Sequence, residues 1–324
     1  MDEQSVRVAY IAGWGRSGST LLNRMIARTP GYIGVGEMRD IWQRGCLENR
    51  LCGCGEPFAS CQFWGDVGAE AFGGWKHVDA QLLNRLRRQT DGLRYLPWLV
   101  GAAPVAYENR LRLITGALSR LYRAIATVSG ARVIVDSSKI STYAMLLHRS
   151  DSLDVHAVHL VRDSRGVVFS WQKRMPRADS PTTATEYMRT YSTAGACARY
   201  TTHNLVASAL PRAGIPYMRV RYEDLVSDPA ATLRSILEAL DPDVRPCLNI
   251  STEDPALAFA TDHSVDGNPM RLKGSVQLRA DIEWMTAMRN ADRRTVTAMT
   301  YPMLRKYGYP SMRSPSITSG EAQP

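Results

Sequence analysis

The stretch VRVAYIAGWGRSGSTLLNRMI, residues 6–26, decides the fold. It begins with a short apolar run that ends in glycine, which predicts a buried strand over residues 6–13. A glycine-rich loop follows at 13–20, and from Ser19 onward apolar residues recur with helical spacing until TPG at 29–31 ends the pattern. A strand, a glycine loop and a helix, in that order, form the setting of a phosphate-binding loop.

The loop GWGRSGST has three glycines, three hydroxyl side chains and one arginine. Backbone N–H groups and the helix dipole converge at such a place, so the loop is predicted to bind an anion. A nucleoside-triphosphate loop has lysine where this chain has Ser19. Because that lysine stabilises a transferred γ-phosphoryl group, its absence favours a donor with a shorter anionic end, such as an adenylyl sulfate. The predicted donor-binding residues of the loop are Arg16, Ser17, Gly18, Ser19 and Thr20.

Three further apolar runs predict buried strands. They are ARVIVDSSK at 131–139, expected to end as a strand at Asp136, LDVHAVHLVRD at 153–163, and IPYMRVRYEDL at 215–225. Helical patterns follow the last two runs, and strands that alternate with helices favour a parallel sheet covered on both faces. The predicted fold class is therefore α/β, with three layers, a central and mostly parallel sheet, and a P-loop-like anion loop.

The chain is expected to form one domain over residues 1–310, because neither an internal repeat nor a clear linker interrupts it. Residues 66–130 alternate basic and apolar positions, which predicts two or three helices that form a cap over an acceptor pocket. Residues 311–324 are polar and rich in serine and proline, so we expect a disordered tail.

Forty lysine and arginine residues against 31 aspartate and glutamate residues give the 324-residue chain a formal net charge of +9. This excess favours a small anionic ligand. The chain has no long run of like charges and no basic stripe with interleaved aromatic residues, which argues against nucleic acid as a partner. It also has no stretch of 18 apolar residues and no signal-peptide pattern at its start, so we expect a cytoplasmic protein without membrane insertion.

Four of the six cysteines lie close together in the sequence. Such a group can bind zinc, but the Cys-x-Cys pair lacks the usual spacer of two to four residues. Disulfides and buried thiols therefore stay open as alternatives, and we predict no required metal. The four residues are Cys46, Cys52, Cys54 and Cys61.

Residues 13–42 resemble sulfotransferases that use 3′-phosphoadenosine 5′-phosphosulfate (PAPS), above all the branch with the tyrosylprotein and bacterial small-molecule enzymes. The likeness lies in the Arg-Ser-Gly-Ser-Thr loop and in Gly-Glu-Met-Arg at 36–39, which is one residue shorter than the family's downstream Gly-Glu-x-x-Arg. Two further segments are similar to the family, LVRDSRGVVFSW at 160–171 and VRYEDLVSDP at 220–229. The resemblance is discontinuous over residues 6–230, but its three motifs stand in the family's order.

The resemblance implies PAPS as co-substrate, phosphoadenosine bisphosphate (PAP) as product and a small-molecule hydroxyl as acceptor. It places Arg162 and Ser170 on the 3′-phosphate and Tyr222 near the nucleotide. Glu37 matches the family's proposed base, and Lys139 matches the lysine aimed at the leaving oxygen, while Arg16 and the loop amides hold the 5′-phosphate. Glu37 also has an alternative interpretation as a carboxylate that stabilises a helix start.

The segment HSVDGNPMRLKG at 263–274 is similar in composition to a late Arg-Lys-Gly element that covers the 3′-phosphate and adenine in cytosolic members of the family. It adds Arg271 to the predicted donor-binding residues, and Lys273 and Gly274 with less support. The acceptor itself is not specified by the sequence. Aromatic residues of the predicted cap could line its pocket, namely Tyr95, Trp98, Tyr107 and Tyr122.

Two other function classes are compatible with parts of the sequence. RVIVD, residues 132–136, has the form of a Walker B strand, in which Asp136 would hold magnesium in an ATP- or GTP-dependent kinase or phosphotransferase. A nucleotide- or RNA-binding module without chemistry would leave Glu37 and Lys139 without a role. If Glu37 is not the base, the next candidates are His148, His156, His159 and His263, of which we rank His263 first.

Overall fold

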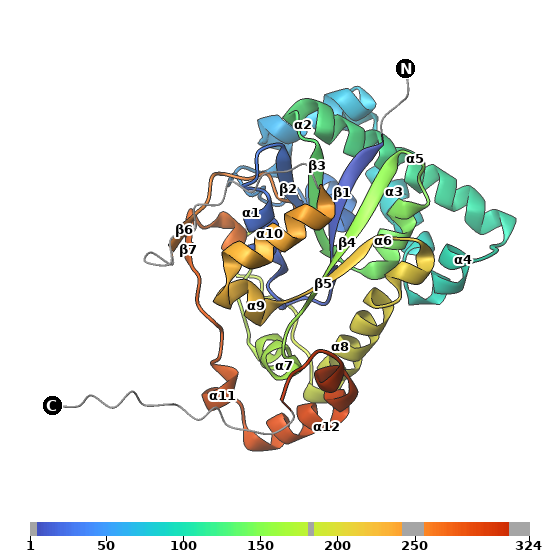
Figure 1. Cartoon of the computed structure of the whole chain (residues 1–324). Helices are drawn as coiled ribbons and strands as arrows, with labels where there is room; N and C mark the ends of the chain where they lie inside the picture. Colours follow the sequence, from blue (N-terminus) through green and yellow to red (C-terminus); the bar gives the residue numbers. More distant parts are fainter. Residues whose placement is uncertain (1–4, 181–184, 242–255, 311–324) are drawn as a thin grey trace.

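The computed structural model describes residues 5–180, 185–241 and 256–310. Its centre is a sheet of five strands in the order β2-β3-β1-β4-β5, with every neighbouring pair parallel (Figure 1). The strands are β1 (Val6–Gly13), β2 (Tyr32–Gly36), β3 (Val133–Lys139), β4 (Leu153–Val161) and β5 (Tyr217–Arg221). Helices cover both faces, so the predicted three-layer α/β fold is confirmed.

The predicted strands are present, with differences at their ends and one strand that was not predicted. In the run predicted at 215–225, only Tyr217–Arg221 forms β5, and the residues from Tyr222 onward are helical. β3 continues to Lys139 rather than ending at Asp136, because after an irregularity its last residue still pairs with Ala12 of β1. The edge strand β2 was not predicted, since YIGVG is short and carries two glycines, which weaken a strand signal. Pairing with β3 stabilises this strand although its local sequence gives only a weak strand signal.

Each face of the sheet has its own apolar core. Helices α5 (Val105–Ser129) and α6 (Ser141–His148) pack on one face against Val8, Tyr10 and Ile134. On the other face lie α1 (Ser19–Ile26) and α10 (Pro229–Leu240), which pack against Ala9, Ile11 and Val135. Alternate residues of β1 and β3 thus serve opposite layers, as a doubly covered parallel sheet requires.

Residues 66–130 are mostly helical, but the segment has four α-helices rather than the predicted two or three. They contain most of α2 (Gln62–Phe72), then α3 (Ala80–Thr90), α4 (Leu96–Val100) and α5. Because α5 buries Leu118, Leu121 and Ile125 in the same cluster as strand residues, this segment forms an outer layer of the domain itself. A role as roof of an acceptor pocket stays a prediction, as does the single-domain boundary at 310.

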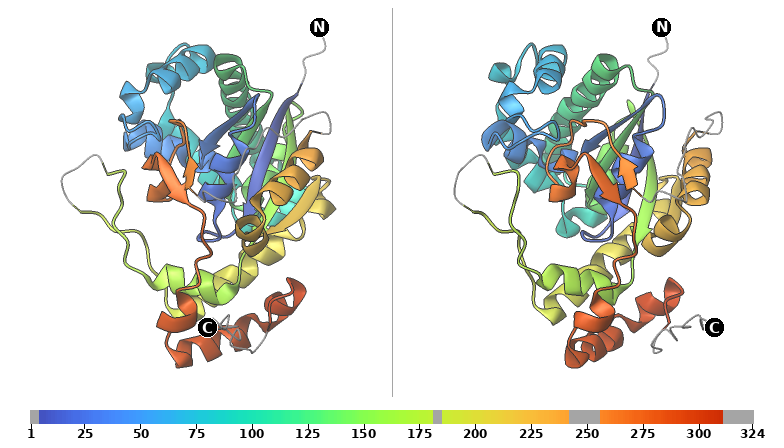
Figure 2. Two further views of the ribbon diagram at one scale, coloured as in Figure 1. Left: turned by 60° about the vertical axis from the view of Figure 1, so that its left-hand side comes forward. Right: turned by 90° about the vertical axis from the view of Figure 1, so that its left-hand side faces the viewer.

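A third apolar cluster lies beyond the carboxyl end of β4. It joins α7 (Ser164–Gln172), α8 (Thr193–Ala207), α11 (Trp284–Ala287) and α12 (Asn290–Lys306). The hairpin of β6 (Ala256–Ala258) and β7 (Ser275–Gln277) packs beside α1, and from β7 the chain runs down to α11 (Figure 2). α9 (Tyr222–Ser227) follows β5 directly. The predicted tail at 311–324 lies outside the described residues.

None of the helices in the described parts of the chain is both long and apolar enough to cross a membrane.

Candidate functional site

The loop between β1 and α1 has a set of unpaired donors. Within the described residues, the backbone N–H groups of 15–21 have no hydrogen-bond acceptor, and the buried Ser17 Oγ has no hydrogen-bond partner. Gly18 precedes α1 with φ 95°, a left-handed conformation that suits glycine, and a Cβ there would lie 2.7 Å from the ring of Tyr222. Buried donors without acceptors are costly, so their concentration at a helix N-terminus indicates an anion site.

Arg16 lies in this loop and has no acidic partner within ion-pair distance among the described residues. Its backbone has φ 69°, and its guanidinium contacts the sulfur atoms of Met175 and Met188 and the ring of Trp171. Burial lowers the pKa of Arg16, whereas the charge of Glu37 raises it. Thioether sulfur is a weak acceptor, so the guanidinium can move to an anion at small cost.

Arg162 follows β4 and its guanidinium links several segments. It donates to the carbonyl oxygen of Arg16 at 3.0 Å, forms an ion pair with Asp281 at 2.9 Å, and lies 4.6 Å from the ring centroid of Tyr222. Tyr222 begins α9, and its ring lies against Gly18. The structure therefore brings Arg162 and Tyr222 next to the glycine loop from distant parts of the sequence, and their contact with a donor stays a prediction.

Ser170 lies on α7, half-buried. A Cβ added at Gly166 would lie 3.2 Å from Arg162 Nη2, so Arg162 covers the first turn of this helix. Residues 166 and 170 are four positions apart and share a helix face. Ser170 therefore lies one helical turn beyond Gly166, on the helix face that Arg162 covers, although no direct contact joins the side chains of Ser170 and Arg162.

Glu37 and Lys139 form an ion pair at the carboxyl ends of β2 and β3. Both are mostly buried, with side chains 18% and 13% exposed, and Lys139 Nζ also donates to the Ser137 carbonyl oxygen at 3.1 Å. Burial raises the pKa of Glu37 to about 7, although Lys139 lowers it. A carboxylate with a pKa in this range is suited to accept a proton near neutral pH.

The same pair lies next to the anion loop. A Cβ built on Gly267 would be 3.4 Å from Glu37 Oε1 and 3.7 Å from Thr20 Oγ1, so both side chains border this glycine. Glu37 precedes a short 3₁₀ turn at Met38–Asp40, but its side chain makes no capping hydrogen bond. The alternative interpretation as a helix-start carboxylate therefore loses its main support.

Asp136 is fully buried and faces away from solvent. Its Oδ1 accepts hydrogen bonds from the Ser138 backbone N–H at 2.8 Å and hydroxyl at 2.5 Å, and its Oδ2 accepts one from the Tyr122 hydroxyl at 2.5 Å. Burial raises the pKa of Asp136 to about 6. Both oxygens are committed to protein donors, which disfavours the predicted alternative in which Asp136 holds magnesium.

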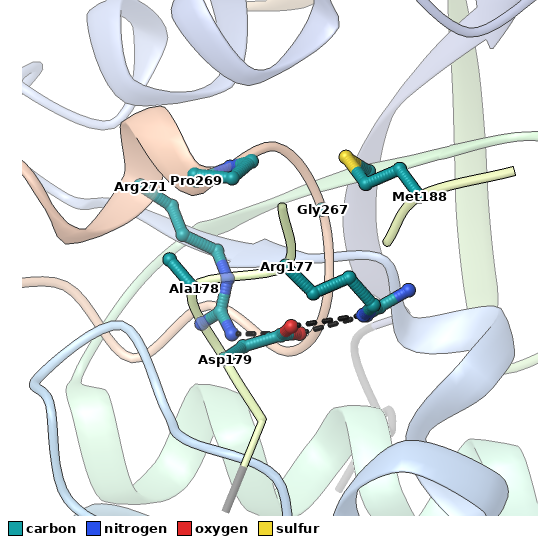
Figure 3. Close-up of a pocket in the computed structure, with 7 residues that line it drawn as sticks. All are labelled: Arg177, Ala178, Asp179, Met188, Gly267, Pro269 and Arg271. Carbon is teal, nitrogen blue, oxygen red and sulfur yellow. Dashed lines mark hydrogen bonds and ion pairs between the residues drawn. The ribbon is translucent and has the colours of Figure 1, made fainter. Parts of the chain in front are cut away.

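Arg271 is 2% exposed and binds protein groups from several segments. Its guanidinium donates to the carbonyl oxygens of Ser264 and Leu51 and pairs with Asp179 at 3.5 Å. Figure 3 shows Asp179 between Arg271 and Arg177 in a small pocket beside Gly267. These contacts give Arg271 a structural role, and a contact with the donor stays a prediction. Nearby, the Lys273 carbonyl accepts from Arg24 and the Gly274 carbonyl from the Phe259 amide.

The alternative histidines are placed less favourably. His159 is buried, with its ring nitrogens bound to the Tyr217 hydroxyl at 2.7 Å and Asn204 Oδ1 at 2.8 Å, and burial lowers its pKa to about 4. His156 pairs with Asp154. His263 contacts cysteine sulfur atoms rather than Glu37 or the loop.

Sequence reasoning missed two neighbours of the site. Asp281 pairs with Arg162 across 119 positions, and Asp266 lies near Glu37 and raises its pKa. No local pattern marks either residue, because each reaches the site only through the path of the C-terminal segment. Within the described residues, the predicted aromatic walls Tyr107 and Tyr122 are fully buried, with their hydroxyls bound to Thr90 and Asp136, so they belong to the core.

Two solved structures resemble the chain. One is a sulfotransferase domain from an olefin synthase of Synechococcus PCC 7002, with 22% identity, a TM-score of 0.49 and coverage of 96% of this chain and 98% of that one. The other is a sulfotransferase domain from the curacin biosynthetic pathway, with 16% identity, a TM-score of 0.47 and coverage of 95% and 98%. Likenesses at this level say nothing about donor or acceptor. No curated protein sequence matches the chain.

A family model described as the sulfotransferase family matches residues 71–246, more than half of the chain. The matched range contains Lys139, Arg162, Ser170 and Tyr222, whereas the anion loop and Glu37 precede it. The geometry of the site and this match agree, and the chain belongs to the sulfotransferase family.

Proposed function

We propose that this protein transfers a sulfuryl group from PAPS to the hydroxyl of a small-molecule acceptor. The observation that carries the proposal is the set of unpaired donors at 15–21 beside the Glu37–Lys139 pair. The donors suit the anionic end of a phosphosulfate, and the pair supplies one base and one cation, the two groups that transfer to an alcohol needs.

The loop residues Arg16 to Thr20 would hold the 5′-phosphosulfate. Ser17 Oγ lacks a partner and the Arg16 guanidinium has only weak ones, so both have donors to give to an anion. Arg162 and Ser170 would receive the 3′-phosphate, with Tyr222 beside the nucleotide. In this proposal the 3′-phosphate replaces Asp281 as the anionic partner of Arg162.

The reaction breaks the sulfur–oxygen bond to the bridging oxygen of the donor, whose electron pair stays on the 5′-phosphate of PAP. A new sulfur–oxygen bond forms to the acceptor oxygen, and Glu37 takes the proton from that hydroxyl. Lys139 stabilises the charge that develops on the bridging oxygen. When Lys139 turns from Glu37 to that oxygen, the carboxylate loses its cationic partner and becomes a stronger base.

Donor binding tests the proposal against the kinase alternative. We expect PAP to raise the melting temperature and to bind in calorimetry without magnesium, and 3′-dephospho-PAP, which is AMP, to bind at least tenfold more weakly because a charge-assisted contact is missing. Stabilisation by ATP-magnesium together with no response to PAP would overturn the assignment. A Ser17→Ala variant provides a matched probe, since it removes only the unpaired loop hydroxyl and should weaken both nucleotides.

A further inference from the structure

Three cysteines and one histidine form a compact cluster outside the candidate active site. Cys52, Cys54, Cys61 and His263 place one sulfur or nitrogen atom each within 4.8 Å of one another. His263 Nδ1 lies 3.3 Å from Cys61 Sγ and 3.7 Å from Cys52 Sγ, and Cys54 Sγ lies 3.7 Å from Cys61 Sγ. None of the four lies within the range matched by the family model.

These separations match the edges of a zinc tetrahedron. Zn–S bonds of about 2.3 Å and Zn–N bonds of about 2.0–2.1 Å give edges of roughly 3.8 Å between two sulfurs and roughly 3.5 Å between sulfur and nitrogen. A disulfide between Cys54 and Cys61 would need sulfurs about 2.05 Å apart. The observed set fits four ligands around one metal ion better than it fits a covalent pair.

The local backbone favours a metal ligand at one of the positions. Cys61 directly precedes α2, so its sulfur lies at a helix N-terminus, where the helix dipole favours negative charge. A helix N-terminus stabilises the deprotonated sulfur that a metal requires.

The surroundings bury two of the four residues and partly cover the other two. Cys52 and Cys61 are 1% and 2% exposed, whereas Cys54 and His263 are half-buried. The Phe63 ring stacks on His263 at 4.6 Å, and Trp64 Nε1 donates to the His263 carbonyl at 3.0 Å. Four protein ligands around one ion leave no coordination position for water or substrate, which distinguishes a structural zinc site from a catalytic one.

The Cys-Gly-Cys spacing has a structural reason here. A Cβ at Gly53 would lie 2.0 Å from Asp262 Oδ1, so the turn that carries Cys52 and Cys54 approaches the segment of His263 as closely as glycine allows. The Gly53 amide donates to the Ser264 carbonyl at 3.0 Å. The turn and the histidine segment therefore meet in a fixed arrangement although they are more than 200 positions apart in the chain.

We propose that Cys52, Cys54, Cys61 and His263 bind one structural zinc ion that fastens the segment 262–267 to the turn at 52–56. This segment continues directly to the active site, because the Glu37 amide donates to the Val265 carbonyl at 2.7 Å and Gly36 forms a parallel bridge with Val265. The proposal departs from the sequence-based prediction of no required metal, and His263 takes the place of Cys46 beside the other three cysteines.

Metal content of the full chain tests the proposal directly. Protein purified under reducing conditions without chelator should carry about one zinc per chain, and cobalt substitution should give the absorption of a tetrahedral site with thiolate ligands. His263→Ala and Cys61→Ser should lose the metal. Cys46→Ser and Cys197→Ser are matched controls that should keep it.

His263→Cys separates loss of a ligand from loss of the fold. It offers a fourth thiolate, so it should retain the metal and shift the cobalt spectrum. Chelation of the native protein should lower the melting temperature by more than about 5 °C, because bound metal stabilises only the folded state. Reduced protein that neither contains nor takes up zinc or cobalt would overturn the proposal. So would metal loss in Cys46→Ser, or a Cys54–Cys61 disulfide found by thiol titration of protein kept from reductant.

Discussion

Asp136 and Glu37 are two buried carboxylates at the same edge of the sheet, and they have opposite surroundings. Gly36, which precedes Glu37, pairs in register with Asp136 on the neighbouring strand. Burial raises the pKa of both, to about 6 for Asp136 and about 7 for Glu37. Asp136 faces the hydroxyl of Tyr122 and the backbone of Ser138, whereas Glu37 faces Lys139 and the anion loop.

The difference shows that the partners of a buried carboxylate, rather than its pKa alone, distinguish a structural from a catalytic group. Asp136 has its oxygens satisfied by donors that cannot leave without cost. Through the Ser138 hydroxyl, which also accepts from the Arg39 amide at 3.0 Å, it positions the turn that starts at Glu37. Glu37 pairs with the side chain of Lys139, and in the proposed reaction its carboxylate accepts the proton of the acceptor hydroxyl.

The largest expected effect is on turnover in Glu37→Gln. Glutamine keeps the shape but cannot accept the acceptor proton, so kcat should fall by about two to four orders of magnitude. PAP affinity should change little, because it does not depend on proton transfer. The free energy of unfolding at about pH 5 should also change little, because Glu37 is protonated there and uncharged like glutamine. Steady-state kinetics, calorimetry and urea unfolding of the same preparation measure the three quantities.

Asp40→Asn is the matched control for this variant, since Asp40 is a second carboxylate near Glu37. It should retain most of the turnover. If Glu37→Gln keeps more than about a third of native turnover, far above the loss expected for a general base, Glu37 is not the base.

The second-largest expected effect is on stability rather than on turnover. Asp136→Ala leaves the Tyr122 hydroxyl and two Ser138 donors without an acceptor, so the free energy of unfolding should fall by about 2–4 kcal/mol. Urea unfolding measures the loss, and Tyr122→Phe, which removes one donor, should cost only about 1 kcal/mol. An Asp136→Ala protein of native stability that had lost a magnesium-dependent phosphotransfer would instead support the kinase alternative.

The sequence allowed the local parts of this comparison to be predicted. β1, the glycine loop and α1 are continuous in the chain, so their pattern predicts both the fold, which is confirmed, and an anionic ligand, which stays a prediction. Arg162 and Tyr222 were placed by motifs at strand ends, where a parallel sheet brings them together. The role of Asp136 was not predictable, because the pattern RVIVD does not show that Tyr122, 14 positions earlier, meets its carboxylate.

Contacts between distant segments account for the remaining differences between the sequence-based predictions and the structure. Spacing identified the cysteine group, but His263 is 202 positions from Cys61 and only the folded chain brings the two together. Arg271 was assigned from local composition, whereas its partners Leu51 and Asp179 come from distant segments. Residues whose partners are distant in the chain are those for which local patterns carry least information.

Asp281 is a third carboxylate for this comparison, and it pairs with Arg162, which is proposed to bind the 3′-phosphate of the donor. Burial opposes its ionisation, but the charge of Arg162 outweighs this and lowers the pKa of Asp281. If Asp281 occupies the place of the 3′-phosphate, Arg162→Ala should weaken PAP by about ten- to a hundredfold and AMP hardly at all. Asp281→Asn should tighten PAP a few-fold by freeing Arg162. Equal losses for PAP and AMP in Arg162→Ala would contradict the assignment.

The smallest expected effect is a shift in pH dependence. If the ionised carboxylate of Glu37 is the base, as proposed, kcat/KM should fall about tenfold per pH unit below about pH 7 and level off above it. Lys139 lowers the pKa of Glu37 and Asp40 raises it, so Lys139→Ala should move this limb to higher pH and Asp40→Asn to lower pH. The ionisation of Asp136 should not affect the pH dependence of kcat/KM, because Asp136 does not contact the reacting atoms in the proposed reaction.

The free energy of unfolding should also depend on the ionisation of Glu37, but it should decrease over the pH range in which kcat/KM increases. The pKa of Glu37 is raised above its ordinary value of 4.5, so its contribution to stability is complete below that value and is lost as pH rises through about 7. Glu37→Gln cannot ionise, and it should therefore gain stability relative to the native protein between pH 5 and pH 8, a range chosen to bracket this ionisation at about pH 7. Asp136 ionises in the native protein as well as in this variant, so the difference between the two unfolding curves isolates Glu37. A rate limb near pH 4.5, together with a stability difference that does not vary with pH, would show that Glu37 is solvated like an ordinary surface carboxylate.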